Sequence, residues 1–435
     1  MRLTPVAFSY FKKYVQREIA KATGVAVYKP VQGWREVRKK RWYYDENRPW
    51  TDAAKSENLP NKFHKPVLIE PIADEEWTVF KGDRMFFSTA ASHSGIGEGV
   101  LLGLGNPLLD ITIYTDTIFL QRYNLKPNNA ILATCEHQAM FHDMVQNYNP
   151  TYIAGGATQN SIRVAQWLLQ RRHSTTFFGG VGDDYFRHIL EEKAAEVGVK
   201  VCYQVHKDRR TGICGAIITG EDRSLVTELG AAELFTEEFL HQEDNWSYVE
   251  KARVCYVGGF VLPVSPKAVL SIARHCSLRQ KMLVMNLHAT FLAKHFADPS
   301  LGIMQYVDIL FGNGDEAAEF SSRAGFNTTD IKEIALKTAA LPKANASKPR
   351  IVVFTQGKDS TIVAFGRTLR EVPVTPIDHE LIKDTNGCGD AFVGGFLSQL
   401  VQQRPLEECL QCGSYAARVV LQNYGCTFPP VPDYP

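Results

Sequence analysis

The most informative stretch of the chain is Asp384-Thr385-Asn386-Gly387-Cys388-Gly389-Asp390-Ala391-Phe392-Val393-Gly394-Gly395-Phe396. Glycines on both sides of Cys388 free the backbone to turn sharply, and an apolar run with helical spacing follows Asp390. Such a turn directs several backbone N–H groups at one point, and the new helix adds the positive end of its dipole. The stretch therefore predicts a site for phosphoryl oxygens, with a carboxylate at its rim that can take a proton from an attacking alcohol. An ordinary strand-to-helix turn, with Asp390 as an N-terminal charge, is the structural alternative.

Length and composition describe an ordinary globular protein. The chain has 435 residues, 45% of them hydrophobic, and a formal net charge of +1. This length is sufficient for one large α/β domain and a smaller one. The charge balance gives no support for nucleic-acid binding, and no apolar run approaches the length needed to cross a bilayer. The nine scattered cysteines favour reduced thiols in an intracellular compartment.

From Val100 onward, strand-like runs alternate with helix-like stretches. The predicted strands are Val100–Leu104, Thr176–Val181, Val254–Val257, Met282–Leu287, Ile309–Phe311 and Ile351–Thr355, and the predicted helices include Asn160–Gln170, Tyr185–Glu196, Pro266–His275, Asp315–Ala324 and Ile331–Ala340. This order predicts an α/β fold with a mostly parallel central sheet, helices on both faces and ligands at the carboxyl ends of the strands. Segments near Ile111–Thr134 and Val201–Leu229 predict a small separate sheet, a lid. We expect Leu341–Arg350 to be an exposed loop.

Several other junctions carry residues suited to ligand binding, while the sequence has no P-loop motif and no dinucleotide fingerprint. Asp110 comes just after the first strand, where a carboxylate can accept two hydrogen bonds from a vicinal diol, although capping a turn is the alternative. Gly155 and Gly156 let the backbone approach a ligand, and Asn160 follows at a helix start. Arg223 lies at a turn of the predicted lid, and a lone surface arginine is by itself weak evidence for a ligand site.

Asn313 and Glu316 follow another strand and are three residues apart. On one face of a helix they can order Mg²⁺-bound waters beside phosphates. The alternative is a capping box with Asn313 as the cap, and both interpretations are compatible.

Eight segments in register resemble the adenosine kinases of the PfkB/ribokinase family, between about Val100 and Pro432. They are Asn106–Asp110, Gly155–Trp167, Asp222–Leu225, Lys251–Gly259, Tyr306–Asn313, Phe354–Gly357, Asp384–Val401 and Cys426–Pro429. The resemblance implies a ribokinase-like fold and the ATP-dependent phosphorylation of adenosine at its 5′-hydroxyl, which gives AMP. A PfkB-type nucleoside or sugar kinase of broader specificity is the alternative within enzymes.

The resemblance also implies roles for matching residues. Asp390 would be the catalytic base, and Gly387, Cys388 and Gly389 would form the anion hole. The substrate site would comprise Asn106, Asp110, Gly155, Gly156, Asn160, Cys214, Leu225 and Phe260. The ATP site would comprise Arg223, Asn313, Thr355 and Gly357, with Glu316 and Asn313 organising Mg²⁺ through water. Cys388 replaces the small residue usual in the anion hole, and its place near a helix start favours a thiolate.

Residues 1–84 do not match the kinase pattern. Residues 2–21 alternate apolar and basic positions, like a mitochondrial targeting segment or a solvated basic helix. Residues 66–84 resemble the beginning of a KOW motif in a mitochondrial large-subunit ribosomal protein, and the second half of that motif does not follow. We therefore expect a largely disordered basic extension over residues 1–84, a flexible joint over residues 85–99 and a kinase domain over residues 100–435, with lid segments at about 108–155 and 205–232.

The expected partners are adenosine and ATP, with Mg²⁺ as cofactor, and the kinase domain is expected to be monomeric without nucleic-acid or membrane partners. A ribosome-associated structural role through residues 1–84 is the alternative from a different class. The expected location is cytoplasmic and in part nuclear, or mitochondrial if the extension acts as a targeting segment.

Overall fold

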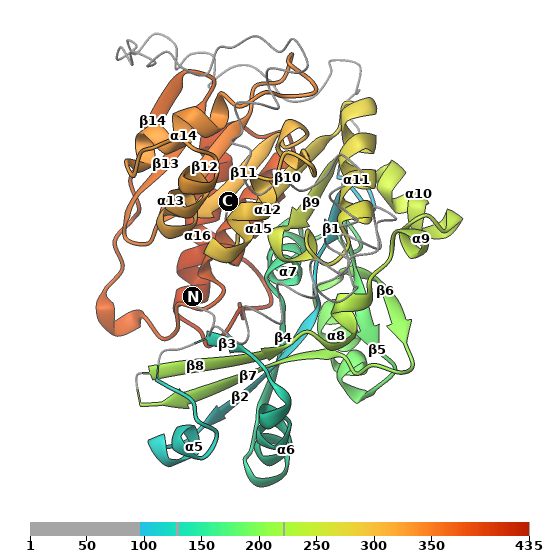
Figure 1. The fold of residues 1–435 in the computed structure, drawn as a ribbon, viewed down its shortest axis with the longest axis vertical. Coiled ribbons are helices and arrows are strands. Elements are labelled where there is room, and N and C mark those ends of the chain that lie inside the picture. Colours follow the sequence, from blue (N-terminus) through green and yellow to red (C-terminus); the bar gives the residue numbers. More distant parts are fainter. Residues whose placement is uncertain (1–95, 128–129, 221, 435) are drawn as a thin grey trace, which may run out of the picture.

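The computed structural model describes residues 96–127, 130–220 and 222–434, which form a large sheet with helices on both faces and a smaller sheet beside it (Figure 1). The predictions for residues 1–84, and most of the predicted joint, lie outside the described residues.

The large sheet has nine strands in the order β14-β13-β12-β11-β10-β9-β1-β5-β6. Their bounds are β1 Leu101–Leu104, β5 Thr175–Gly182, β6 Lys200–His206, β9 Val254–Gly258, β10 Met282–Asn286, β11 Ile309–Asn313, β12 Ile351–Gln356, β13 Asp359–Phe365 and β14 Thr368–Val372. The strands from β6 to β12 pair in parallel, and β13 and β14 add an antiparallel edge. The mostly parallel sheet that the alternating pattern predicted is therefore present.

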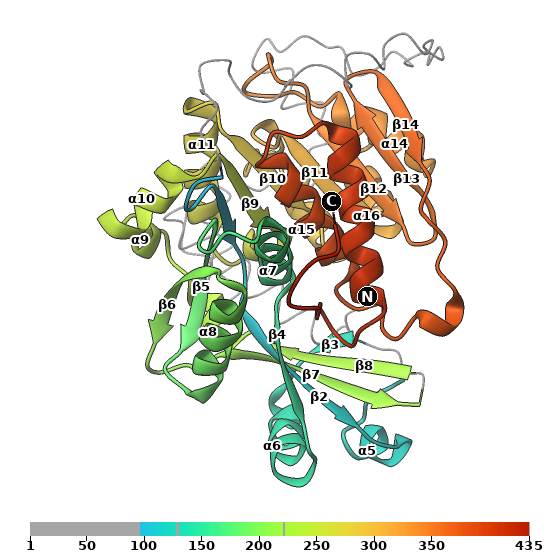
Figure 2. The same cartoon turned by 180° about the vertical axis from the view of Figure 1, so that it is seen from behind.

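Helices cover both faces of this sheet (Figures 1 and 2). On the face toward the viewer in Figure 1 are α11 (Pro266–Leu278), α12 (Ala293–Phe296), α13 (Gly314–Arg323) and α14 (Ile331–Ala339), with α9 (Glu237–Leu240) and α10 (Glu243–Lys251) at the side. On the face toward the viewer in Figure 2 are α7 (Ala157–Leu169), α8 (Tyr185–Val197), α15 (Cys388–Leu400) and α16 (Leu406–Leu421).

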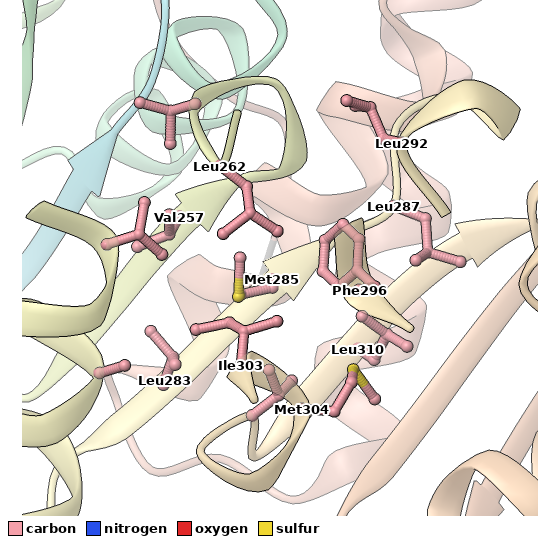
Figure 3. Packing of buried hydrophobic residues seen from close by; sticks show 14 of the residues in the cluster. Val257, Leu262, Leu283, Met285, Leu287, Leu292, Phe296, Ile303, Met304 and Leu310 are labelled. Carbon is pink, nitrogen blue, oxygen red and sulfur yellow. The ribbon is translucent and has the colours of Figure 1, made fainter. Parts of the chain in front are cut away.

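The alternation of side chains along each strand supplies a hydrophobic core on each face. In β9, Cys255 and Val257 pack in one core, whereas Val254 and Tyr256 pack in the other. Figure 3 shows part of the first core, in which Phe296 lies beside Met285 of β10, and Leu287 and Leu292 lie on the far side of Phe296 from Met285. Complete burial of a side chain of this size stabilises the fold by about 1.5–3 kcal/mol. The loop that follows β10 is therefore anchored at Leu287 and again at Leu292.

The small sheet has five strands in the order β3-β8-β7-β2-β4. Their bounds are β2 Leu108–Tyr114, β3 Ala130–Leu132, β4 Thr151–Gly155, β7 Gly212–Thr219 and β8 Asp222–Glu228. Helices α5 (Thr117–Arg122) and α6 (Gln138–Asn147) lie on its side away from the large sheet (Figure 1). The exact limits of the lid segments, and of the domains, stay a prediction.

Two expectations from the sequence were wrong in part. Val201–Leu229 was expected to belong to the small sheet as a whole, but its first strand, β6, pairs with β5 at the edge of the large sheet. Val201 and Tyr203 of β6 pack against the core of the large sheet, which explains why β6 joins the large sheet. The chain changes sheets in the charged residues 207–210, between β6 and β7.

Leu341–Arg350 was expected to be an exposed loop, and it forms no helix or strand. However, Arg350 is completely buried and donates hydrogen bonds to main-chain carbonyls, including those of Thr338 and Val307. The ammonium of Lys343 lies 2.5 Å from the Asp308 carboxylate. These contacts fix the loop against the protein, because a buried guanidinium must find acceptors for its N–H groups.

Within the part of the chain that the structure describes, no helix combines the length and the apolar character needed to cross a membrane.

Candidate active site

Helix α15 begins without a side-chain cap. Its cap residue, Gly387, has a φ of 79°, and no side chain bonds to the first turn. A Cβ on Gly387 would lie 2.9 Å from the Cβ of Cys426, whereas a Cβ on Gly389 would meet nothing within 4 Å. Glycine is therefore required at position 387, and the space beside Gly389 is open. The N–H groups of a helix's first turn have no intrahelical acceptor. The Cys388 N–H makes a long bond of 3.4 Å to the Thr385 carbonyl, and no described side chain accepts from this turn, so it can bind an anion.

Asp390 lies in this first turn and connects α15 to α7. The Asn160 side-chain amide donates to its carboxylate at 3.1 Å. Burial raises the pKa of Asp390 to about 7, an effect that the Asn160 hydrogen bond opposes and that the charges of Asp110 and Glu316 reinforce. A carboxylate with a pKa near neutrality is well matched to accepting a proton at physiological pH.

Asp110, on β2 of the small sheet, packs against Gly155, the first of the two glycines before α7. A Cβ on Gly155 would lie 2.2 Å from an Asp110 carboxylate oxygen. Gly156 has a φ of 85°, and a Cβ there would lie 2.3 Å from the carbonyl oxygen of Asn106. Burial raises the pKa of Asp110 to about 7, against the opposing charges of Arg223 and Arg163. The glycine pair thus permits the close approach of Asp110 and Asn106 to the start of α7, whereas its predicted contact with a ligand stays a prediction.

Two side-chain oxygens near these residues lack a partner. The Oδ1 atoms of Asn106 and Asn160 are buried and accept no hydrogen bond from the described residues. The amide nitrogen of Asn106 donates to the carbonyl of Phe260 at 3.3 Å, which fixes its orientation. Buried polar atoms are nearly always paired in folded proteins, so these two oxygens are free to accept a hydrogen bond from a bound molecule.

The remaining residues predicted for the substrate site lie on the adjacent strands of the small sheet. Cys214 of β7 is in register with Asp110, and Leu225 of β8 pairs with Ala216 of β7. The Thr227 hydroxyl donates to the Cys214 sulfur at 3.3 Å. These contacts place Cys214 beside Asp110 and Leu225 one strand further from it.

Arg223 of β8 forms an ion pair with Asp384, the first residue of the turn before α15. The Asp384 carboxylate also accepts from the N–H groups of Asn386 at 2.9 Å and Gly425 at 2.8 Å. The small sheet is therefore connected by charge to the start of the anion turn. Sequence reasoning assigned no role to Asp384, although an acid six residues before Asp390 in the same motif was the available signal.

Asn313 and Glu316 form the capping box that sequence analysis gave as one interpretation. The Asn313 side-chain oxygen accepts from the Glu316 N–H at 2.9 Å, and the Glu316 carboxylate accepts from the Asn313 N–H at 3.1 Å. Burial raises the pKa of Glu316 to about 7. Thr355 is in register with Asn313 on β12, and Gly357, with a φ of 63°, follows at the end of that strand with open space beside it.

The Cys388 thiol differs from the sequence-based expectation of a thiolate. Burial, followed by the charges of Asp384 and Asp390, raises its pKa to about 12. The expectation was wrong because burial and the nearby carboxylates both favour the neutral thiol. None of the nine cysteines forms a disulfide in the structure, and their reduced state in an intracellular compartment stays a prediction.

Residues 125–433 match the family described as pfkB family carbohydrate kinase. The chain belongs to this family. Its relatives there include adenosine kinase 2 of Arabidopsis thaliana, with 44% identity over 78% of this chain and 98% of the relative. The adenosine kinase of Schizosaccharomyces pombe is 37% identical over 76% of this chain and 96% of its own length.

Solved structures of adenosine kinases also resemble this chain. The Anopheles gambiae adenosine kinase in complex with P1,P4-di(adenosine-5) tetraphosphate has a TM-score of 0.73 and 44% identity, covering 78% of this chain and 100% of its own. The Schistosoma mansoni adenosine kinase in complex with adenosine and AMP has a TM-score of 0.70 and 30% identity, covering 77% of this chain and 98% of its own. The predicted ribokinase-like α/β fold is confirmed.

Proposed function

We infer that this protein is an ATP-dependent adenosine kinase, which transfers a phosphoryl group to the 5′-hydroxyl of adenosine and releases AMP and ADP. The relatives and structural neighbours support this reaction over nearly their full length. The observation that carries the proposal is the uncapped start of α15 with Asp390 beside it, held by Asn160. A donor cradle for phosphate and a carboxylate near neutral pKa are the parts that phosphoryl transfer to an alcohol requires.

We propose that Asp390 accepts the proton of the attacking hydroxyl. The N–H groups of Gly387, Cys388 and Gly389 would stabilise the charge of the transferred group, because donors fixed in place need no reorganisation during the reaction. Arg223 would add a positive charge on the same side. Its pairing with Asp384 holds it near the anion turn before any nucleotide arrives.

The nucleoside would bind between the small sheet and α7. Asp110 and Asn160, beside Gly155 and Gly156, are the groups proposed for the ribose hydroxyls, and the unpartnered oxygen of Asn160 supports that role. Asn106, Cys214, Leu225 and Phe260 would border the base, and the other unpartnered oxygen belongs to Asn106.

The nucleotide phosphates would lie toward the carboxyl ends of β11 and β12, beside Asn313, Thr355 and Gly357. No group of three His, Cys, Asp or Glu residues that could hold a metal occurs among the described residues. The donor set thus fits Mg²⁺ held mainly by phosphates and water, with Glu316 and Asn313 contacting its waters, as Mg²⁺ prefers. Mg²⁺ bound with ATP supplies charge neutralisation between the phosphates.

A coupled assay of ADP release tests this function, with adenosine, inosine, guanosine and ribose as acceptors. We expect the highest kcat/KM with adenosine and formation of AMP in equal amount to ADP. Equal rates with adenosine and ribose would support the kinase of broader specificity instead. No nucleoside-dependent release from folded protein would refute the proposal.

The expectations of a monomer, of a cytoplasmic location and of a ribosomal role for residues 1–84 stay predictions. The last of these depends on residues outside the described part of the chain.

A further inference from the structure

His288 occupies an unusual backbone conformation in the loop after β10. Its φ is 62°, in the left-handed region that disfavours residues with a Cβ. The loop cannot easily relax, because Leu287 before it and Leu292 after it are both buried in the core shown in Figure 3. A strained conformation that the surrounding structure maintains is a frequent mark of a functional site.

The hydrogen bonds of the imidazole fix its orientation and its tautomer. Nδ1 accepts from the main-chain N–H of Gly259 at 3.0 Å, and Nε2 lies 3.2 Å from the hydroxyl of Tyr256. Because Nδ1 is an acceptor, a neutral ring carries its proton on Nε2. Burial lowers the pKa of His288 to about 3, so the ring stays neutral throughout the physiological range.

The same ring contacts the residue proposed to border the nucleobase. Phe260 stacks on His288 with ring centroids 5.3 Å apart and an angle of 16° between the ring planes. Phe291 lies on another side of Phe260, with centroids 6.1 Å apart. The carbonyl of Phe260 accepts from Asn106, so the position of this aromatic ring also bears on a second base-site residue.

The other contacts of His288 extend toward the phosphate side of the site. Its main-chain N–H donates to Asn286 at 3.2 Å and is also near enough to Glu316 to lower the pKa of that carboxyl. Burial, and then the charge of Asp390, raise the pKa of Tyr256, whose hydroxyl lies next to His288. One residue therefore contacts the Phe260 ring through its side chain and Glu316 through its main chain.

We propose that His288 is a positioning residue for nucleobase recognition, which acts by stacking behind Phe260 and bonding to Gly259 while its main chain is fixed beside Glu316. This inference rests on the proposed function. It assigns to His288 a contribution to the affinity and selectivity for the base, and not to the chemical step. Nothing in its contacts requires it to touch the substrate.

The variant His288→Asn tests the effect of the aromatic ring separately from that of the backbone conformation. Asparagine tolerates the left-handed conformation, and its Oδ1 can still accept from Gly259, but it offers no aromatic face to Phe260. Loss of one aromatic pair should raise the KM for adenosine about three- to tenfold. The ratio of kcat/KM for adenosine to that for inosine should fall by a similar factor, with kcat at saturation within about twofold of wild type.

A second variant, His288→Gly, adopts the same conformation without strain and should show the same change if His288→Asn does not fold. His173→Asn is the matched control, since His173 also has a positive φ, of 59°, and lies in the turn before β5, where its N–H donates to the Gly198 carbonyl. It should leave both KM and the base preference unchanged.

A folded His288 variant with wild-type KM and base preference overturns the proposal, even if its melting temperature is lower, because a structural residue would give that result. If wild-type protein itself shows no adenosine-dependent ADP release, the proposed function fails and this inference fails with it. An active wild type with an unaffected His288→Asn refutes the inference alone.

Discussion

Helices α13 and α15 both begin at the candidate site with an acidic first turn, but only α13 has a side-chain cap. In α13, Asn313 caps the helix and Glu316 bonds back to it. In α15 the cap position is Gly387 in a left-handed conformation, without any side-chain bond, and Asp390 is instead held by a residue of α7.

This difference separates a structural helix start from one available to a ligand. A side-chain cap contributes about 1 kcal/mol to stability by satisfying N–H groups of the first turn. In α13 the side chain of Asn313 uses one of those groups, whereas the first turn of α15 has no side-chain acceptor. The absence of a cap is therefore the property that makes the start of α15 suitable for a phosphoryl group.

Replacing one acid in the first turn of each helix should give the largest difference in kcat. Asp390→Asn should lower kcat by about two to four orders of magnitude while adenosine binding persists, because a positioned base is lost. Asp315→Asn, in the first turn of α13, should leave kcat within about twofold. Steady-state kinetics and adenosine titration of both variants provide the measurement. If Asp390→Asn retains kcat within about tenfold of wild type, Asp390 is not the base.

The cap glycine should give the next largest effect. Gly387→Ala places a methyl group against Cys426 in a backbone conformation that disfavours it. We expect kcat to fall about 10- to 100-fold as the N–H donors shift, with a lower melting temperature. In α13, a Cβ on Gly314 would approach only Ile331, at 3.9 Å, so Gly314→Ala should be active and no less stable. Equal activity of the two variants would contradict a special role for the α15 turn.

Glu316→Gln distinguishes the structural role of Glu316 from a role in ordering Mg²⁺. Glutamine preserves the capping box but removes the charge, so the melting temperature should hardly change. If Glu316 contacts Mg²⁺-bound waters, the Mg²⁺ concentration for half-maximal rate should rise about tenfold. Mg²⁺ titrations at fixed ATP measure this effect. An unchanged Mg²⁺ dependence would reduce Glu316 to a helix cap.

The smallest effect is expected at Cys388. Cys388→Ala should keep kcat within about threefold of wild type, because the proposed anion hole uses the main-chain N–H and not the thiol. The raised pKa keeps the thiol protonated at neutral pH, so alkylation by iodoacetamide should inactivate wild type only slowly. Rapid inactivation that Cys388→Ala abolishes would show that the thiol is far more reactive than its surroundings indicate.

The comparison of these two helix starts also shows which features of the fold and site the sequence could predict. The two helix starts, the parallel sheet and the place of Asp390 in the first turn of α15 were predictable because glycine spacing and hydrophobic periodicity are local signals. Cys388 was misjudged because burial and the charge of Asp384 arise only in the folded protein. The partner of Arg223 and the position of β6 likewise depend on contacts between distant segments. His288 had no sequence signal, since its backbone conformation is imposed by the anchored loop around it.

The central claim is that Asp390, at the uncapped start of α15, is the base for phosphoryl transfer to adenosine. The most direct test is the pH dependence of kcat/KM for adenosine, which reports groups that ionise in the free enzyme. A protonated carboxyl cannot accept the hydroxyl proton, and the pKa of Asp390 is raised to about 7. Since Asp110 titrates in the same range, the profile reports apparent values for the group of carboxyls. We predict a plateau above about pH 8 and a fall of at least about tenfold by pH 6, which Asp390→Asn makes shallower. A kcat/KM that stays level down to about pH 5 would contradict the account.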